Sequence, residues 1–210
     1  MSEASLRAEM CDVGRCLWER KLVGAAEGNL SVRLGEGSLL CTPAGIPKEL
    51  LRPDDLLIID HQGKPVDGGT PSSEIKLHLR IYDRRPDCQA VVHAHPITAT
   101  AFSVAGKEIP SDLLPEAAYV LGRVATVPFA VPGTEDVPDA IEPFLSDHKT
   151  FLLSHHGAVT LGKTLTDACQ RMETLERIAE LLLRAEMLGG SKPLPEAGRL
   201  VIESWISPLL

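Results

Sequence analysis

Residues 89–96 read QAVVHAHP, a short apolar run that ends in two histidines and a proline. Its length and its β-branched residues predict a buried strand. Because side chains alternate along a strand, His93 and His95 are expected on the same face. Two adjacent imidazoles at the end of an apolar strand suit a divalent metal ion, and two ordinary polar residues at a strand end are the simpler interpretation.

A second pair of histidines follows another apolar run, residues 149–154 (KTFLLS), and precedes a glycine. A third imidazole from this place would complete a three-histidine site with room for a substrate, which is typical of a catalytic metal. Only one of the adjacent residues His155 and His156 can easily face the same point as the first pair. Spacing alone leaves the choice between them open.

Glu74 follows Ser72 and Ser73 at the start of a predicted helix. One interpretation is local: serine caps the helix, and a carboxylate in the first turn is stabilised by the helix dipole. The other interpretation is chemical. A carboxylate beside a metal ion, with its pKa tuned by that ion and by burial, suits general acid–base catalysis.

Three loops have the composition of anion-binding sites: Gly28-Asn29, residues 42–45 (TPAG), and Ser72-Ser73. Each offers backbone N–H groups or hydroxyls near a turn or a helix start, which a phosphate group needs. Each is also an ordinary turn signal.

Hydrophobic periodicity along the rest of the chain predicts a mixture of helices and strands. Helices are expected near residues 6–17, 75–82, 96–104, 131–144 (after a turn) and 165–188. Strands are expected at residues 30–34 and 38–41 as a hairpin, at 55–60 and at 123–129, and residues 149–154 and 157–162 are expected to form two short strands or one bent strand. This order favours an α/β layered domain with a mixed or antiparallel sheet.

Two of these helices carry more detailed signals. Ile75, Leu79 and Tyr82 fall on one face of the helix that follows Glu74. Thr164 or Thr166 can cap the last helix, and Gly189-Gly190 can end it. The chain lacks the G-x-G-x-x-G dinucleotide motif and the G-x-x-x-x-G-K-[ST] phosphate loop.

Composition narrows the class of protein. The 210 residues carry a formal net charge of −8, which does not favour a nucleic-acid partner. No apolar run approaches the ~20 residues that span a bilayer, and the N-terminus lacks the apolar block of a signal peptide. We expect one cytoplasmic domain over residues 1–210, without nucleic-acid or membrane partners. The five cysteines include no C-x-x-C pair, so neither a disulfide framework nor a cysteine zinc site is expected, and Cys41 and Cys169 are expected to fill the core.

Several stretches resemble, as a set and in order, the class II aldolase/adducin family, and in particular its fuculose-phosphate aldolases. They are GNLSVRL, CTPAGIPKELLRPDDLLIID, PSSEIKLHLRIYDRRPD, AVVHAHP, VPGTED, LLSHHGAVTLGK and METLE, and they span residues 25–188 approximately. The resemblance implies a three-layer α/β fold with a mixed, largely antiparallel central sheet flanked by helices. It also implies a homotetramer with active sites between subunits.

The resemblance assigns roles to individual residues. It implies a zinc ion, or manganese or cobalt in its place, held by His93, His95 and His156, with His155 as a neighbour. Glu74 matches the catalytic glutamate of the family, which also touches the metal when substrate is absent. The phosphate-binding loops of the family correspond to Gly28, Asn29, Ala44, Gly45, Ser72 and Ser73.

The implied reaction is cleavage of a ketose 1-phosphate or a related hydroxy-ketone through a metal-stabilised enediolate, with Glu74 moving the proton. The same site could instead serve decarboxylation, epimerisation or dehydration of a related sugar phosphate or keto or aromatic acid, since a fold does not fix a reaction. A third hypothesis is a non-catalytic, adducin-like interaction module. The retained carboxylate and imidazoles count against that module.

The chain departs from the fuculose-phosphate aldolases at several positions. Ala26 and Ala44 stand where those enzymes have threonines on phosphate loops, and Glu27 adds a negative charge, which leaves open whether the substrate is phosphorylated. Leu114 stands where they have a tyrosine that serves a neighbouring site. Asp112 or Glu116 could replace that tyrosine, whereas Tyr119 is expected to be structural. The apolar tail, with Trp205, Ile206, Leu209 and Leu210, is expected to pack on its own subunit or on another.

Overall fold

The computed structural model describes residues 2–206, with the backbone alone for Glu36 and residues 203–206. Seven strands form one sheet in the order β3-β2-β1-β4-β7-β6-β5. The strands are β1 (Asn29–Arg33), β2 (Leu39–Cys41), β3 (Leu57–Ile59), β4 (Ala90–Ala94), β5 (Val124–Val127), β6 (Thr150–Leu153) and β7 (Gly157–Gly162). Within residues 2–206 only β5 and β6 pair in parallel, so the prediction of a mixed, largely antiparallel sheet is confirmed.

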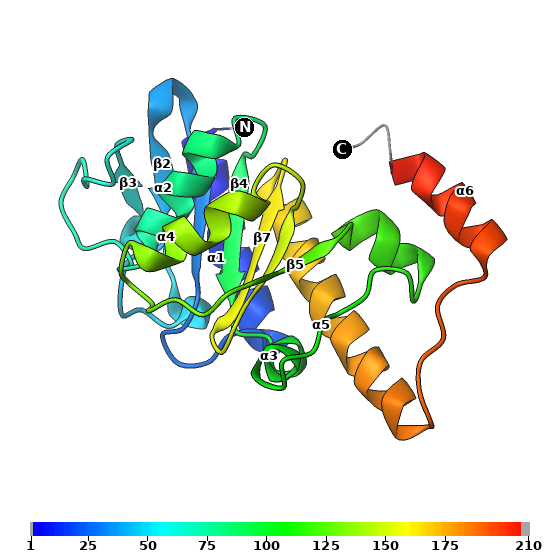
Figure 1. Cartoon of the computed structure of the whole chain (residues 1–210). Coiled ribbons are helices and arrows are strands. Elements are labelled where there is room, and N and C mark those ends of the chain that lie inside the picture. The colour runs from blue at the N-terminus through cyan, green and yellow to red at the C-terminus, as the bar shows by residue number, and fades with distance from the viewer. Residues whose placement is uncertain (1, 207–210) are drawn as a thin grey trace.

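Helices cover both faces of this sheet, which gives three layers (Figure 1). The α-helices are α1 (Glu3–Glu19), α2 (Ile75–Arg84), α3 (Ile97–Val104), α4 (Asp136–Ile141), α5 (Leu165–Met187) and α6 (Glu196–Ile206). Short helical turns are η1 (Gly35–Gly37), η2 (Lys48–Leu50), η3 (Pro53–Asp55), η4 (Ala117–Leu121) and η5 (Glu142–Phe144). Residues 149–154 and 157–162 give the two antiparallel strands β6 and β7, not one bent strand.

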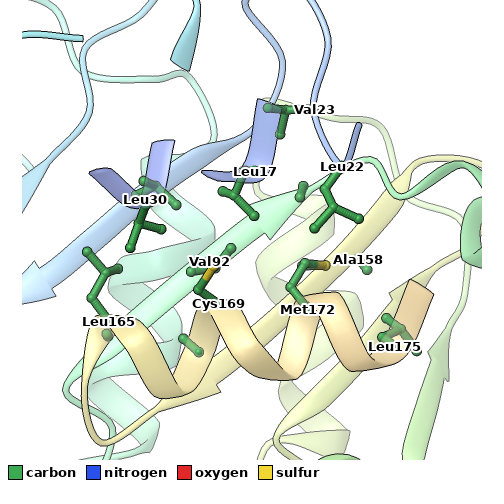
Figure 2. Packing of buried hydrophobic residues seen from close by; sticks show 14 of the residues in the cluster. Leu17, Leu22, Val23, Leu30, Val92, Ala158, Leu165, Cys169, Met172 and Leu175 are labelled. Atoms are coloured by element: carbon green, nitrogen blue, oxygen red, sulfur yellow. The ribbon is translucent and has the colours of Figure 1, made fainter. Parts of the chain in front are cut away.

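One core lies between the sheet and the helices α1, α3 and α5. Apolar residues recur every three or four positions on α1 and α5, so each helix presents one continuous stripe to the strands. Figure 2 shows Leu165, Cys169, Met172 and Leu175 along the side of α5 that meets Val92 and Ala158 of the sheet. Cys169 is buried, as predicted.

The second core lies under α2 and α4, on the opposite face of the sheet. The helix after Glu74 forms as predicted, and its predicted apolar face, Ile75, Leu79 and Tyr82, packs against this core. Leu77, Ile81 and Tyr82 are buried, whereas Ile75 and Leu79 are only partly buried at the edge of this core. The helix is therefore turned so that the residue after Leu77, His78, also faces the interior.

The last helices show how the C-terminal part of the chain is arranged. Thr164, not Thr166, caps α5, because its side chain accepts a hydrogen bond from the N–H of Asp167. Beyond Gly189 and Gly190 the chain turns back, and α6 packs against η4 (Figure 1). The side chains of Trp205, Ile206, Leu209 and Leu210, whose packing the sequence predicts, lie outside the described part.

Across residues 2–206, no helix is both long and apolar enough to cross a bilayer.

Candidate metal centre

The central strand β4 supplies the first two histidines of the site. Its side chains alternate, so Ala90, Val92 and Ala94 enter the core under α5. His93 points to the opposite face, beneath α2, and is fully buried. His95 follows just beyond the end of the strand and is partly buried.

The turn between β6 and β7 supplies the third histidine and separates the two adjacent candidates. His155 adopts a left-handed backbone conformation with φ of 56°. Its N–H donates to Ser103 Oγ at 3.1 Å, and its exposed ring stands edge-on to Phe129. The chain therefore reverses at His155, and the next side chain, His156, turns inward. The structure brings His156, and not His155, to the first two histidines.

The three imidazoles form a nearly equilateral group. The ring centroids are 5.0 Å apart for His93 and His95, 4.8 Å for His93 and His156, and 5.0 Å for His95 and His156. The Nε2 atoms of His93 and His95 are 3.2 Å apart. One ligand nitrogen from each of the three rings lies close enough to the others to share a single cation.

Glu74 completes the group from the start of α2. Its Oε1 lies 3.1 Å from Nε2 of His156, and its Oε2 lies 3.2 Å from Nε2 of His93. Asn29 Nδ2 donates to Oε2 at 2.8 Å. The carboxylate makes no capping bond to its own helix, and the hydroxyl of Ser72 accepts the N–H of Glu74 instead. Ser72 therefore has the capping role that the sequence suggested for this helix start, whereas the carboxylate of Glu74 faces the imidazoles.

Electrostatics in this group follow from burial and charge. Burial alone raises the pKa of Glu74, but the charge of His93 and the close contacts of His156 and His93 with the carboxylate outweigh it and leave the pKa well below its usual range. Burial, together with the charges of His93 and His156, lowers the pKa of His95 to about 4. Glu74 is thus held as a carboxylate and His95 as a neutral imidazole, the states in which both bind metals.

Outer contacts fix which nitrogen of each ring faces inward. Nδ1 of His93 lies 2.9 Å from the carbonyl oxygen of Ala158, which can only accept, so Nδ1 donates and Nε2 is the nitrogen that faces the centre. Nδ1 of His95 lies 3.7 Å from Oε2 of Glu27, and that same oxygen accepts the N–H of Gly24 at 3.0 Å. The carboxylate of Glu27 therefore contacts Nδ1 of His95 in the same way that the carbonyl of Ala158 contacts Nδ1 of His93.

Two glycines allow this close packing. A Cβ on Gly157 would lie 2.6 Å from the carbonyl oxygen of Ala94 and 2.7 Å from the ring of His95. Gly28 has a φ of +70°, and a Cβ there would lie 2.7 Å from the carbonyl oxygen of His93. Larger residues at either position would displace the imidazoles.

The donor set fits a divalent metal ion such as Zn²⁺. Three imidazole nitrogens and one carboxylate converge, and they do not satisfy one another fully: Glu74 Oε1 is buried, and Nε2 of His156, 3.1 Å away, makes no well-aligned hydrogen bond to it. Three nitrogens and an oxygen at one point are a common zinc ligand set.

The expected substrate loops lie beside this centre, but not all of their donors are free. Asn29 and Ser72 are joined by a hydrogen bond of 3.2 Å, and Ser73 lies against Gly133. The N–H of Ala44 already donates to the carbonyl oxygen of Thr70 at 2.9 Å. A Cβ on Gly45, which has a φ of +75°, would meet nothing within 4 Å, so its backbone is open to a ligand.

The residues considered as substitutes for a neighbouring tyrosine lie elsewhere in the fold. Leu114 packs partly buried against the first core. Asp112 lines a cavity with Arg123 and Arg199, next to α6. Tyr119 is 60% exposed in the single subunit, and its structural role stays a prediction.

Comparison with known proteins gives the family. The model of the class II aldolase and adducin N-terminal domain matches residues 8–183. The chain belongs to the class II aldolase and adducin family.

Members that act on different substrates are similar to this chain. It is 36% identical over 185 residues to a 3-oxo-tetronate 4-phosphate decarboxylase from Pectobacterium atrosepticum, covering 86% of this chain and 85% of the relative. It is 35% identical over 174 residues to an L-fuculose phosphate aldolase from Methanococcus maripaludis, with 82% and 93% covered. The crystal structure of YgbL from Klebsiella pneumoniae has a TM-score of 0.86 at 32% identity, covering 94% of this chain and 97% of YgbL.

Sequence reasoning missed two features of this class II aldolase family site. It treated Glu27 only as a charge near a phosphate loop, whereas its carboxylate contacts His95. It gave no role to Gly157 beyond marking which histidine precedes it. The motif H-H-G held the second signal, because a glycine directly after a candidate ligand indicates a close approach of other atoms.

Proposed function

We propose that this chain is a divalent-metal-dependent lyase that breaks a carbon–carbon bond next to a carbonyl group. The observation that carries the proposal is the convergence of three Nε2 atoms with a carboxylate that is held ionised and not used for capping. An interaction module has no need for such a costly buried group of titratable side chains.

A divalent ion bound by His93, His95 and His156 would supply Lewis-acid stabilisation of the oxygens of the substrate's enediolate. Glu74 moves the proton. Because its pKa is low, Glu74 is ionised before substrate binds, so it first accepts the proton of the substrate hydroxyl and then returns it to the enediolate carbon. Solvent water supplies the one further proton that decarboxylation of a carboxylate consumes, and this proton restores the hydroxyl. The amide of Asn29 holds one carboxylate oxygen and leaves the other oriented toward the centre.

Decarboxylation of a 3-oxo acid with a neighbouring hydroxyl group is the reaction that we favour. Carbon dioxide leaves without a proton, so one acid–base group, Glu74, is sufficient. Aldol cleavage also requires a base for the hydroxyl that becomes the aldehyde, and Leu114 stands where fuculose-phosphate aldolases have their tyrosine. The similarity to the decarboxylase from Pectobacterium atrosepticum supports the same choice.

Aldol cleavage of a ketose 1-phosphate or related hydroxy-ketone is the second candidate, supported by similarity to the aldolase from Methanococcus maripaludis. Both reactions form an enediolate, so they require the same metal ligands and the same glutamate. They differ in the fragment that leaves.

The anionic end of the substrate is placed, in this proposal, on Gly45, Ser72 and Ser73. Glu27 repels an anion from the Gly28 side, and the N–H of Ala44 is already bonded to Thr70. Lys48, three residues after Gly45, is buried, which lowers the pKa of its amine, and its charge acts on His93, where it lowers the pKa of the imidazole. These groups act locally against the net charge of −8.

The test is turnover of the metal-loaded protein with a 3-oxo acid phosphate and, separately, with a ketose 1-phosphate. Release of carbon dioxide supports decarboxylation, and release of an aldehyde supports aldol cleavage. Glu74→Gln is expected to lower kcat by about 100-fold or more with metal content retained. The exposed Glu19→Gln serves as the control. Absence of both stoichiometric metal and turnover would refute the lyase proposal and favour the interaction module.

We further propose that four subunits assemble, with active sites between them, as the family resemblance implies. The mass by light scattering is then four times the 22.7 kDa of one chain. A monomer with full turnover would contradict this part of the proposal alone.

A further inference from the structure

A second group of metal-ligating side chains lies between α1 and α5, away from the histidines. Cys16 comes from the last turns of α1, and Cys169 and Glu173 lie one turn apart on α5. Sγ of Cys16 lies 3.2 Å from Oε1 of Glu173, and Sγ of Cys169 lies 3.9 Å from the same oxygen. The two thiols and the carboxylate all lie within 4.8 Å of one another.

The two sulfur–oxygen separations, 3.2 and 3.9 Å, lie on either side of the edge length of a tetrahedral site. With metal–sulfur bonds of about 2.3 Å and metal–oxygen bonds of about 2.1 Å, ligand sulfurs lie roughly 3.8 Å apart and sulfur and oxygen roughly 3.5 Å apart. We propose that Cys16, Cys169 and Glu173 bind a thiophilic divalent cation of the zinc class, with water as the fourth ligand, and thereby tie α1 to α5.

The surroundings provide access and an attractive field for a cation. The group opens into a surface depression that Glu9 and Asp12 also line, so an ion can enter from solvent. Burial raises the pKa of Cys169 to about 12 and raises that of Cys16, with Glu173 adding to both shifts. A divalent cation offsets this cost, and each thiol gives up its proton to solvent as the metal–sulfur bond forms.

Arg20 currently occupies the cation's place beside the carboxylate. Its Nε lies 2.9 Å from Oε1 of Glu173, and its side chain is 59% exposed. A long, exposed arginine exchanges partners readily, because surface ion pairs contribute little free energy. It therefore competes with the metal, and Arg20→Gln is expected to tighten metal binding.

Cadmium is the probe, because thiolate-to-cadmium charge transfer absorbs in the near ultraviolet and the histidine centre contains no sulfur. Protein whose histidine centre is already filled with zinc is titrated with Cd²⁺. We expect one further equivalent to give the absorption band and to raise the Tm. The band should fall by at least half in Cys16→Ser and in Cys169→Ser, and the affinity should fall about tenfold or more in Glu173→Gln. Cys11→Ala, which removes another buried thiol of α1, should change neither the absorption band nor the affinity for Cd²⁺.

Several outcomes would overturn the proposal. A band that requires a large excess of cadmium, or that keeps its intensity in Cys16→Ser, would show that these thiols do not form the site. A titration that finds only three free thiols of the five in purified protein, restored by reductant, would assign Cys16 and Cys169 to a disulfide instead. Weaker cadmium binding in Arg20→Gln would contradict the placement of the ion at Glu173.

Discussion

The side-chain amide of Asn29 donates a hydrogen bond of 2.8 Å to Oε2 of Glu74. Asn29 lies directly opposite His93 on the neighbouring strand β1, so the sheet itself sets the distance between this amide and the metal centre. The carboxylate of Glu74 is thereby oriented by a rigid element and not by its own helix.

Asn29→Ala should therefore lower kcat by roughly 10–100-fold while the protein keeps its metal, because Glu74 loses its orienting donor. Asn29→Asp should be more damaging, since a second carboxylate beside Glu74 raises its pKa and disfavours the ionised form. Steady-state kinetics and metal analysis on the same preparations provide the check, with the exposed Gln62→Ala as the control. Loss of metal in Asn29→Ala would instead assign the amide to metal retention.

Gly157→Ala should weaken metal binding by about 10–100-fold, because the added methyl group would press on the ring of His95 and on the backbone of β4. Gly35→Ala is the matched control, since a Cβ at Gly35 meets nothing within 4 Å. Competition with a chromophoric chelator measures both affinities. Equal affinities in the two variants would remove Gly157 from the account of the site.

Glu27→Ala should weaken metal binding at the histidine centre, because His95 loses the carboxylate behind its Nδ1. The carboxylate of Glu27 lies 3.7 Å from His95, and its side chain is 48% exposed, so the contact is weak. We therefore expect the metal affinity to fall about tenfold, the low end of the range for a residue that supports a metal ligand. Glu27→Gln keeps an acceptor and should recover part of the affinity. Chelator competition measures the metal affinity of the wild type and of both variants, with Glu108→Ala as an exposed control. An unchanged affinity in Glu27→Ala would leave Glu27 only the role of repelling an anionic substrate group.

His78 should make the folded state less stable in mild acid. Burial, with a smaller contribution from the charge of His93, lowers the pKa of His78 from 6.5 to about 3. Between pH 6.5 and about 3 the unfolded chain takes up a proton on His78 and the folded chain does not. The free energy of unfolding therefore has its full value, as far as His78 is concerned, above pH 6.5 and decreases as the pH falls toward 3.

Urea unfolding of wild type and of His78→Gln between pH 7 and pH 5 measures this effect. The free energy of unfolding should fall less steeply with decreasing pH in the variant, whereas the exposed His61→Gln should behave as wild type. Both proteins keep the histidines of the metal centre, so their difference isolates His78. Parallel pH dependences would mean that His78 does not titrate in this range on unfolding.

Much of the fold could be predicted from local signals, because periodicity and turn residues report on elements one at a time. The segment that forms α5 is long enough to show its helical period, and the short apolar runs that form β4 and β6 indicate buried strands. The degree of burial along α2 could not be predicted, because Ile75 and Leu77 are both apolar and only docking on the sheet decides which is fully buried. Strand order likewise depends on contacts between residues far apart in the chain.

The candidate site shows the same division. Strand alternation predicts that His93 and His95 share one face, but it gives no means to choose between His155 and His156. The left-handed backbone at His155 makes that choice, and no residue type at that position signals it. The contacts of Glu27 with His95 and of Cys16 with Cys169 join segments that only the folded chain brings together.

The position of β4 in the middle of the sheet also bears on how the protein folds. Its neighbours β1 and β7 come from distant parts of the chain, so His156 reaches His93 and His95 only after β7 has paired with β4, and Asn29 reaches Glu74 only after β1 has paired with β4. Such non-local closure is slow relative to helix formation. The rate at which refolding protein acquires its metal should therefore report the final docking of the two halves of the sheet, and the bound ion should slow unfolding by acting as a reversible cross-link between them.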